Sequence, residues 1–236
     1  KYFGIGNSLD EYHGELNFYQ DGGIIINANG MKGIGIGSGL GGVINIKRGH
    51  YEFDMKGQEG ACIGSVNGDS ELFIEYCDMD IYSGISNGTI IGSVNGDADI
   101  KLENISAKLQ GAGNVITGIG TIAGNSCMVR LENVNISSNI RAKECYGIGC
   151  RAGKTDIYIG YAAVKSVVQG KSAVAFGNSV MSAKLYCSNA DVGTNAVTEF
   201  NSDIGALEKN IQLENGRAEF ILNGQEIKRQ ILAARL

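Results

Sequence analysis

A repeat of about 28 residues constrains the fold of this chain more than any other feature. The heptapeptide Ile-Gly-Ser-Val-Asn-Gly-Asp occurs at Ile63–Asp69 and again at Ile91–Asp97, 28 residues later. An Ile-Gly or Phe-Gly pair continues this period. The pairs begin at Ile5, Ile36, Ile63, Ile91, Ile119, Ile148, Phe176 and Ile204. Eight repeats therefore account for nearly all of the 236 residues, which predicts a single domain over 1–236.

A second set of positions repeats with the same period. Each pair is followed, about nine residues later, by alternating residues such as Ile44-Asn-Ile46 and Ile100-Lys-Leu102. Alternation with period two is typical of a strand with one buried face. The tripeptide Leu-Glu-Asn follows this stretch in three repeats, at Leu102–Asn104, Leu131–Asn133 and Leu213–Asn215. Three short strands and three turns fill such a repeat.

The array resembles the right-handed parallel β-helix family. Its 36 glycines and many β-branched residues disfavour the helical repeats. The resemblance covers the whole chain, but only at the level of architecture. It implies an all-β fold of about eight 28-residue coils, with stacked Asn and apolar ladders. No signature of a particular β-helix enzyme accompanies it.

An antiparallel barrel or propeller is the alternative, because the chain contains several Asn-Gly pairs and Asn-Gly favours hairpins. Hairpin turns would separate strands every 8–12 residues. Asn67 and Asn95 instead recur at the repeat period. The corners of a solenoid also need positive φ angles, which Gly and Asn adopt readily. We therefore favour the solenoid.

The two ends of the chain differ. Residues 225–236 change to helical spacing, with Ile227, Ile231 and Leu232 on one side, which predicts a C-terminal cap helix. Lys1 instead leads directly into the first repeat. We therefore expect the chain to be a fragment of a longer, bacterial protein, with an upstream domain or signal segment missing.

Composition limits the partners and the compartment. The net charge of −5 argues against nucleic acid, and no apolar run approaches the ~20 residues of a membrane span. The six cysteines occupy mostly different repeat positions, so we expect free thiols. They are Cys62, Cys77, Cys127, Cys145, Cys150 and Cys187. We favour a secreted or cell-surface location, and the free thiols keep a cytoplasmic one open.

Acidic residues gather in the third and fourth repeats. The period places Asp69 beside Asp97 and Glu71 beside Asp99. Like charges about 5 Å apart repel by about 0.8 kcal/mol in water, and a hard cation would relieve this repulsion. Ca²⁺ is the cofactor that such carboxylates suggest, and we expect no other. The alternative is a solvated acidic face.

Aromatic and basic residues occupy the outward centre of the alternating stretch. Tyr158 and Tyr186 lie there in consecutive repeats, and Lys101 and Arg130 hold the same position earlier. Exposed tyrosines beside cations are typical of a surface that binds carbohydrate. The alternative is an aromatic ladder that only stabilises the sheet.

The two histidines are weak candidates for catalysis. His13 and His50 lie at similar offsets in the first two repeats, among carboxylates that could act as general acid and base. These carboxylates are Glu11, Glu15, Glu52 and Asp54.

These observations predict a non-catalytic, adhesin-like binding or spacer module that presents a repetitive face to a polysaccharide or a protein surface. One alternative is a polysaccharide-active β-helix enzyme, a hydrolase or lyase. Another is an intracellular scaffold or sensor domain fused to an absent effector domain.

Overall fold

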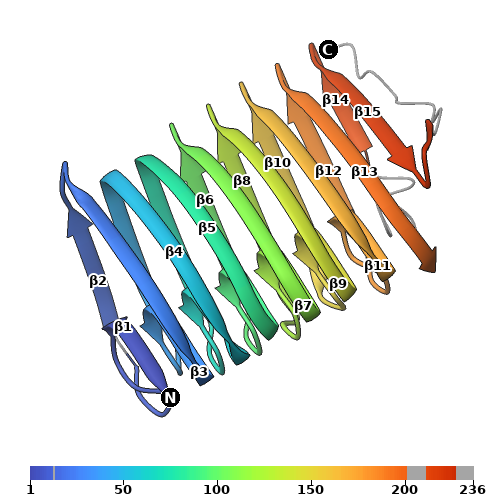
Figure 1. The fold of residues 1–236 in the computed structure, drawn as a ribbon. Coiled ribbons are helices and arrows are strands. Elements are labelled where there is room, and N and C mark those ends of the chain that lie inside the picture. Colours follow the sequence, from blue (N-terminus) through green and yellow to red (C-terminus); the bar gives the residue numbers. More distant parts are fainter. Residues whose placement is uncertain (13, 201–210, 227–236) are drawn as a thin grey trace.

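The computed structural model describes residues 1–12, 14–200 and 211–226, which form a rod of stacked strands (Figure 1). This part of the chain contains no helix, and hence none long and apolar enough to cross a membrane. The strands are β1 (Tyr2–Gly6), β2 (Gly14–Tyr19), β3 (Gly23–Ser38), β4 (Gly42–Ser65), β5 (Ser70–Ser93), β6 (Ala98–Glu103), β7 (Ser106–Thr121), β8 (Ser126–Glu132), β9 (Asn135–Cys150), β10 (Lys154–Gly160), β11 (Ala163–Gly177), β12 (Ala183–Ser188), β13 (Asp191–Phe200), β14 (Ile211–Glu214), β15 (Arg217–Leu222) and β16 (Gln225–Glu226).

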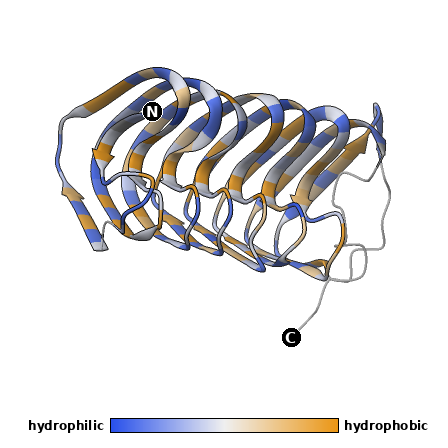
Figure 2. Ribbon diagram, turned by 90° about the horizontal axis from the view of Figure 1, so that it is seen from below, coloured by the Kyte–Doolittle hydropathy of each residue, from blue (hydrophilic) through white to orange (hydrophobic). Residues whose placement is uncertain are grey.

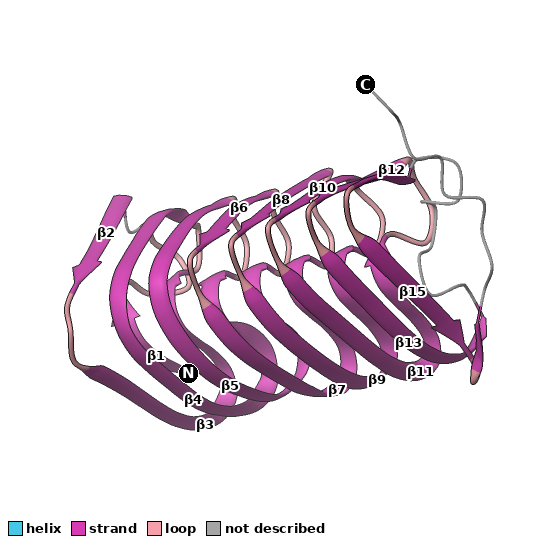
Figure 3. Ribbon diagram, turned by 90° about the horizontal axis from the view of Figure 1, so that it is seen from above, coloured by secondary structure: helices cyan, strands magenta, loops and turns pink. Residues whose placement is uncertain are grey.

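One turn of the rod consists of a short strand, a corner and a long curved strand. In the middle of the rod these are β6, the corner at Asn104–Ile105, and β7. In β4 and β5 the short and long parts run together as one strand of 24 residues. The long strands lie side by side along the rod (Figure 3) and pair in parallel from turn to turn.

The predicted parallel β-solenoid is therefore confirmed, with about seven turns. Eight coils were expected from the sequence. The eighth Ile-Gly pair, at Ile204, lies outside the described residues. Each turn also has two strands where three were expected, because the long strand bends without losing its hydrogen-bonded pairing to the next turn.

The Ile-Gly pairs build the core. Ile63, Ile91, Ile119 and Ile148 pair with one another in register and are fully buried. Apolar and polar residues alternate along the strands (Figure 2), and the buried apolar side chains form one core cluster inside the rod. Each turn buries too little apolar surface to be stable alone, so stacking on its neighbours supplies the stability.

In the pairs that the structure describes, the backbone conformation requires the glycine. Gly120 has a φ of 134°, a region that residues with a side chain rarely adopt. A Cβ atom there would overlap the carbonyl oxygen of Gly149 in the next turn. Gly64 and Gly92 have the same φ to within a degree and the same clash with the following turn. Glycine therefore recurs at this bend, where both the φ angle and the neighbouring carbonyl oppose a side chain.

We predict that Gly120→Ala destabilises the rod by about 3 kcal/mol or more, because both the dihedral angle and the neighbouring carbonyl oppose a methyl group. Gly193→Ala is the matched control, since nothing lies within 4 Å of a Cβ there and its φ is not positive. The control should change the free energy of unfolding by less than about 0.5 kcal/mol. Urea unfolding followed by circular dichroism compares the two, and equal losses would contradict the argument.

The corner between the short and long strands has its own column of left-handed residues. Seven successive turns each place one residue there with a φ between 47° and 68°. Asn tolerates this conformation better than most residues, which explains the Leu-Glu-Asn repeat. This left-handed corner consists of Arg48, Tyr76, Asn104, Asn133, Tyr161, Asn189 and Asn215.

The prediction of a cap helix over 225–236 is wrong for its first two residues, Gln225 and Glu226. Asn223 and Gly224 have φ angles of 50° and 79°, and β16 turns back to pair antiparallel with β15. Two successive positive φ angles make a tight hairpin, for which Asn-Gly is the preferred sequence. The rest of the expected helix, 227–236, lies outside the described residues.

All six cysteines are buried and unpaired, as expected. Cys187 takes the core position that Leu131 and Ile159 hold in earlier turns. Burial raises the pKa of the Cys62 and Cys187 thiols to about 12 and that of Cys145 to about 11. Since the thiolate is the reactive form, these side chains act as small apolar residues of the core.

We predict that no thiol reacts with Ellman's reagent at pH 8 in the folded protein, and that all six react in denaturant. Stability should also fall as the pH rises from 9 towards 12, because the unfolded chain loses thiol protons that the folded chain retains. Cys62→Ala/Cys187→Ala should flatten this alkaline decline. Rapid labelling of the native protein would contradict the buried assignment.

Candidate functional site

The four candidate ligand-binding residues lie in one column on the face made by the short strands. Lys101 on β6, Arg130 on β8, Tyr158 on β10 and Tyr186 on β12 are direct neighbours in successive turns. Their side chains point outward because the residues on either side of each are buried. We name these four residues the central column.

The two tyrosines of the central column contact each other. Their ring centroids are 6.4 Å apart and the ring planes are tilted by 50°. Tyr158 is 42% exposed. The Tyr186 hydroxyl donates a hydrogen bond of 2.7 Å to Glu214 in the next turn, which raises its pKa. The bond fixes one ring, and the other stays open to a ligand.

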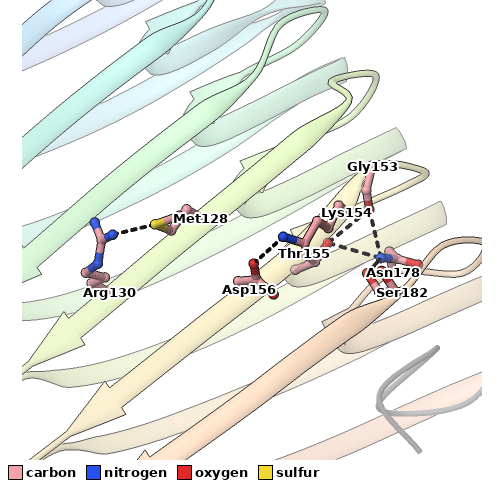
Figure 4. Close-up of polar contacts among 8 residues, drawn as sticks. All are labelled: Met128, Arg130, Gly153, Lys154, Thr155, Asp156, Asn178 and Ser182. Atoms are coloured by element: carbon pink, nitrogen blue, oxygen red, sulfur yellow. Dashed lines mark hydrogen bonds and ion pairs between the residues drawn. The ribbon is translucent and has the colours of Figure 1, made fainter. Parts of the chain in front are cut away.

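The two cations of the central column are paired with carboxylates. Lys101 Nζ lies 2.8 Å from Glu103, which raises the pKa of the lysine. Arg130 Nη1 lies 3.2 Å from Asp99 and a second guanidinium nitrogen contacts the sulfur of Met128 (Figure 4). These pairs are exposed, so each contributes little to stability, but each holds its cation against the sheet.

Acidic residues stack in two columns on the short-strand face, the first of which was expected from the repeat. Glu71 pairs in register with Asp99, and Glu75 with Glu103 and then Glu132. Cations from the same or a neighbouring turn relieve their repulsion. Lys47 lies 2.8 Å from Glu75, Lys101 lies 2.8 Å from Glu103 on the same strand, and Arg130 lies 3.2 Å from Asp99. A protein cation thus offsets the charge of Asp99, one of the four carboxylates for which the sequence suggested a metal ion.

Asp69 and Asp97 have a structural role at the turn between the long strand and the next short strand. Asp69 accepts a hydrogen bond of 2.8 Å from the backbone N–H of Asp97. Asp97 accepts two, from Asn125 at 2.6 Å and Ser126 at 3.0 Å. Among the residues that the structure describes, no group of three or more His, Cys, Asp or Glu is placed to hold a metal ion. The calcium site stays a prediction.

We predict that Asp97→Ala lowers the free energy of unfolding by about 1–2 kcal/mol, because two backbone donors lose their acceptor. Asp97→Asn keeps a side-chain oxygen and should cost less than about 0.5 kcal/mol. Urea unfolding measures these changes. The same titrations test the calcium site, which predicts that millimolar CaCl₂ raises the midpoint of the wild type above its value in EGTA but not that of Asp97→Asn. Equal midpoints in CaCl₂ and EGTA would contradict the calcium site.

The histidine site is not assembled by the described residues. His13 lies outside them. His50 lies beside Asp78 in a hollow of about 350 Å³ on the outer face of the long strands. Glu15 is on the short-strand face instead, where it accepts a hydrogen bond from Asn45. The expected cluster of acid and base is therefore divided between two faces.

A buried asparagine organises the turn between β11 and β12. Asn178 Oδ1 accepts the N–H groups of Val180 and Met181, at 3.1 and 2.8 Å. Its Nδ2 donates to the carbonyl oxygen of Gly153 and to Thr155 of the previous turn (Figure 4). This network presents Val180 and Met181 to solvent, 71% and 50% exposed.

Asn178 belongs to a polar column that the sequence analysis missed. In the six pairs from Ile36 to Phe176, the residue after the pair is buried, and its side chain hydrogen-bonds to a turn carbonyl. This column consists of Ser38, Ser65, Ser93, Thr121, Cys150 and Asn178. The signal was visible in the sequence, because a small polar residue or Cys follows each of these pairs.

The fold defines the chain as a parallel β-solenoid with exposed columns of aromatic and polar side chains. Comparisons with models of protein families, with curated proteins and with solved structures gave no match.

Proposed function

We propose that this β-solenoid is a non-catalytic module that binds polysaccharide on its short-strand face. The observation that carries the proposal is the pair Tyr158 and Tyr186, which lie on consecutive turns of the short-strand sheet with at least one ring open to solvent. Aromatic rings offer an apolar face to the C–H groups of a sugar ring and a hydroxyl at the edge.

The polar groups around the tyrosines suit a ligand rich in hydroxyls. Arg130 and Lys101 continue the column, and Asp99 and Glu103 flank them. Ion pairs on an open surface can exchange one hydrogen bond for another with a sugar hydroxyl at little cost, because water already competes for them. Donors and acceptors therefore lie at the spacing of the turns, about 4.8 Å.

The carboxylates argue for binding rather than catalysis. Hydrolysis of a glycosidic bond needs two carboxyl groups that face each other across the bond. Asp97 is engaged by backbone donors and Asp99 by Arg130. Asp78 and Asp80 project from the same face of β5, side by side, and Asp80 is paired with Lys108.

A glycan-array screen of the 236-residue chain, with and without Ca²⁺, tests the proposal. We expect binding to one class of polysaccharide, and an affinity at least about tenfold lower in Tyr158→Ala/Tyr186→Ala. Tyr158→Phe/Tyr186→Phe keeps both rings and should retain most of the binding. Tyr19→Ala removes another exposed tyrosine, on β2, and should bind as the wild type does.

Two outcomes would contradict the proposal. One is that no glycan binds to the wild type at all. The other is that the alanine double variant binds as well as the wild type and only loses stability, by about 0.5–1.5 kcal/mol, as a purely structural aromatic pair would.

A further inference from the structure

A groove follows the left-handed corner along the rod, apart from the central column. It has a volume of about 890 Å³ and runs past several successive turns. One wall is the left-handed corner, and the other is the first outward residue of each long strand, such as Asp78 and Asn135. Its floor is apolar and buried, with Ile105 and Val134 in adjacent turns. We name it the corner groove.

Two tyrosines stand in the corner groove at backbone positions that disfavour them. Tyr76 and Tyr161 have φ angles of 57° and 47°, in the left-handed region where four other turns place Asn. A bulky side chain there costs of order 1–3 kcal/mol. The two residues are also 53% and 65% exposed, so packing in the core does not offset that cost. Exposed aromatic side chains held in strained positions point to a ligand.

The spacing of the two tyrosines is set by the turns. Residues 75, 103, 132 and 160 pair in sequence along the short strands, so the residues that follow them occupy successive turns. Tyr76 and Tyr161 are therefore three turns apart, or about 14 Å along the axis. Asn104 and Asn133 lie between them, and each turn corresponds roughly to the length of one pyranose unit in an extended chain.

The amides between the tyrosines have unused hydrogen-bonding capacity. Asn133 Nδ2 donates to Asn104 Oδ1 at 2.5 Å. This bond uses one of the two donors of Asn133 and one lone pair of Asn104, and Asn104 Nδ2 donates a long hydrogen bond of 3.5 Å to Glu103. The remaining amide groups can bind hydroxyls along the groove.

The backbone of the corner leaves little for an extended peptide to pair with. The N–H groups of Asn104, Asn133 and Tyr161 already donate to carbonyl oxygens of the following turn, at 2.9–3.0 Å. A peptide that adds to a sheet relies on such backbone groups. Recognition in the corner groove is therefore left to side chains, which suits a sugar chain.

The charge of the corner groove further limits the ligand. Asp78 and Asp191 line it, and no Lys, Arg or His is among its lining residues. The lining therefore offers two negative charges and no positive one to polyuronates, sulfated glycans or nucleic acids, while the in-register neighbours of Asp78 and Asp191 in the adjacent turns are His50 and Arg217. An uncharged polymer meets no repulsion from these carboxylates.

We propose that the corner groove binds one linear, uncharged polysaccharide chain parallel to the axis of the rod. Tyr76 and Tyr161 stack on two of its sugar rings, and Asn104 and Asn133 hydrogen-bond to the hydroxyls between them. This site is separate from the central column, and neither site requires the other.

The test compares Tyr76→Asn/Tyr161→Asn with the wild type. Asn occupies the same corner in other turns, so the double variant should fold, with a thermal midpoint equal to or above that of the wild type. Affinity gel electrophoresis in hydroxyethylcellulose, xylan and glucomannan measures binding, with polygalacturonate as the anionic control. We expect retention by at least one neutral polymer, and an affinity at least about tenfold lower in the double variant.

Chain length gives a second measurement. A disaccharide reaches only one of the two rings, whereas a hexasaccharide reaches both. In the wild type we expect calorimetry to show binding of the hexasaccharide from the retained polymer at least about tenfold tighter than binding of the disaccharide. Either single variant, Tyr76→Asn or Tyr161→Asn, should remove this difference.

Control variants separate this site from the central column. Tyr12→Asn removes an exposed tyrosine elsewhere and should bind as the wild type does. The proposed binding site would be overturned if neutral polymers bound the Tyr76→Asn/Tyr161→Asn variant as well as the wild type. It would also be overturned if only Tyr158→Ala/Tyr186→Ala lost the binding. No retention by any neutral polymer would also overturn it. Binding of a charged glycan through the central column would still support the proposed function.

Discussion

Hydrogen bonds between successive turns run along the axis of this molecule and fix the distance between turns at about 4.8 Å. Every side chain therefore lies about this far from its counterpart in the next turn. Because the pairing is parallel and in register, each residue meets its counterpart in the next turn. Ile stacks on Ile in the core, Gly on Gly at the tight bend and Asn on Asn at the corner. A residue is therefore tolerated according to whether it can lie beside a copy of itself.

Charged side chains satisfy this condition least well, and the short-strand face shows how the chain responds. Where acids stack, as Glu75 on Glu103, a lysine or arginine reaches them from its own or another turn. The central column instead changes its chemistry from turn to turn, from Lys101 to Tyr158. The fold does not require identical residues in this outward column, so its side chains can differ from turn to turn and bind a ligand.

Much of this architecture could be predicted from the repeat, because a fixed period determines which residues share a column. The Ile-Gly core, the left-handed asparagines and the meeting of Tyr158 with Tyr186 all follow from it. Tyr76 and Tyr161 were not recognised as corner residues, because neither is preceded by Leu-Glu and only the strand pairing aligns them with Asn104. The C-terminal hairpin was missed for another reason: Asn-Gly serves as a solenoid corner at Asn215 and as a hairpin at Asn223.

The direction of the backbone hydrogen bonds also determines how the rod responds to force. Tension along the axis pulls each bond along its own length, and a turn can detach from the end while the turns behind it stay paired. A load across the rod has to shear every bond between two turns at once, including the 21 aligned residue pairs of β4 and β5. The molecule should therefore resist a load across the rod strongly, whereas tension along the axis should detach its turns one after another.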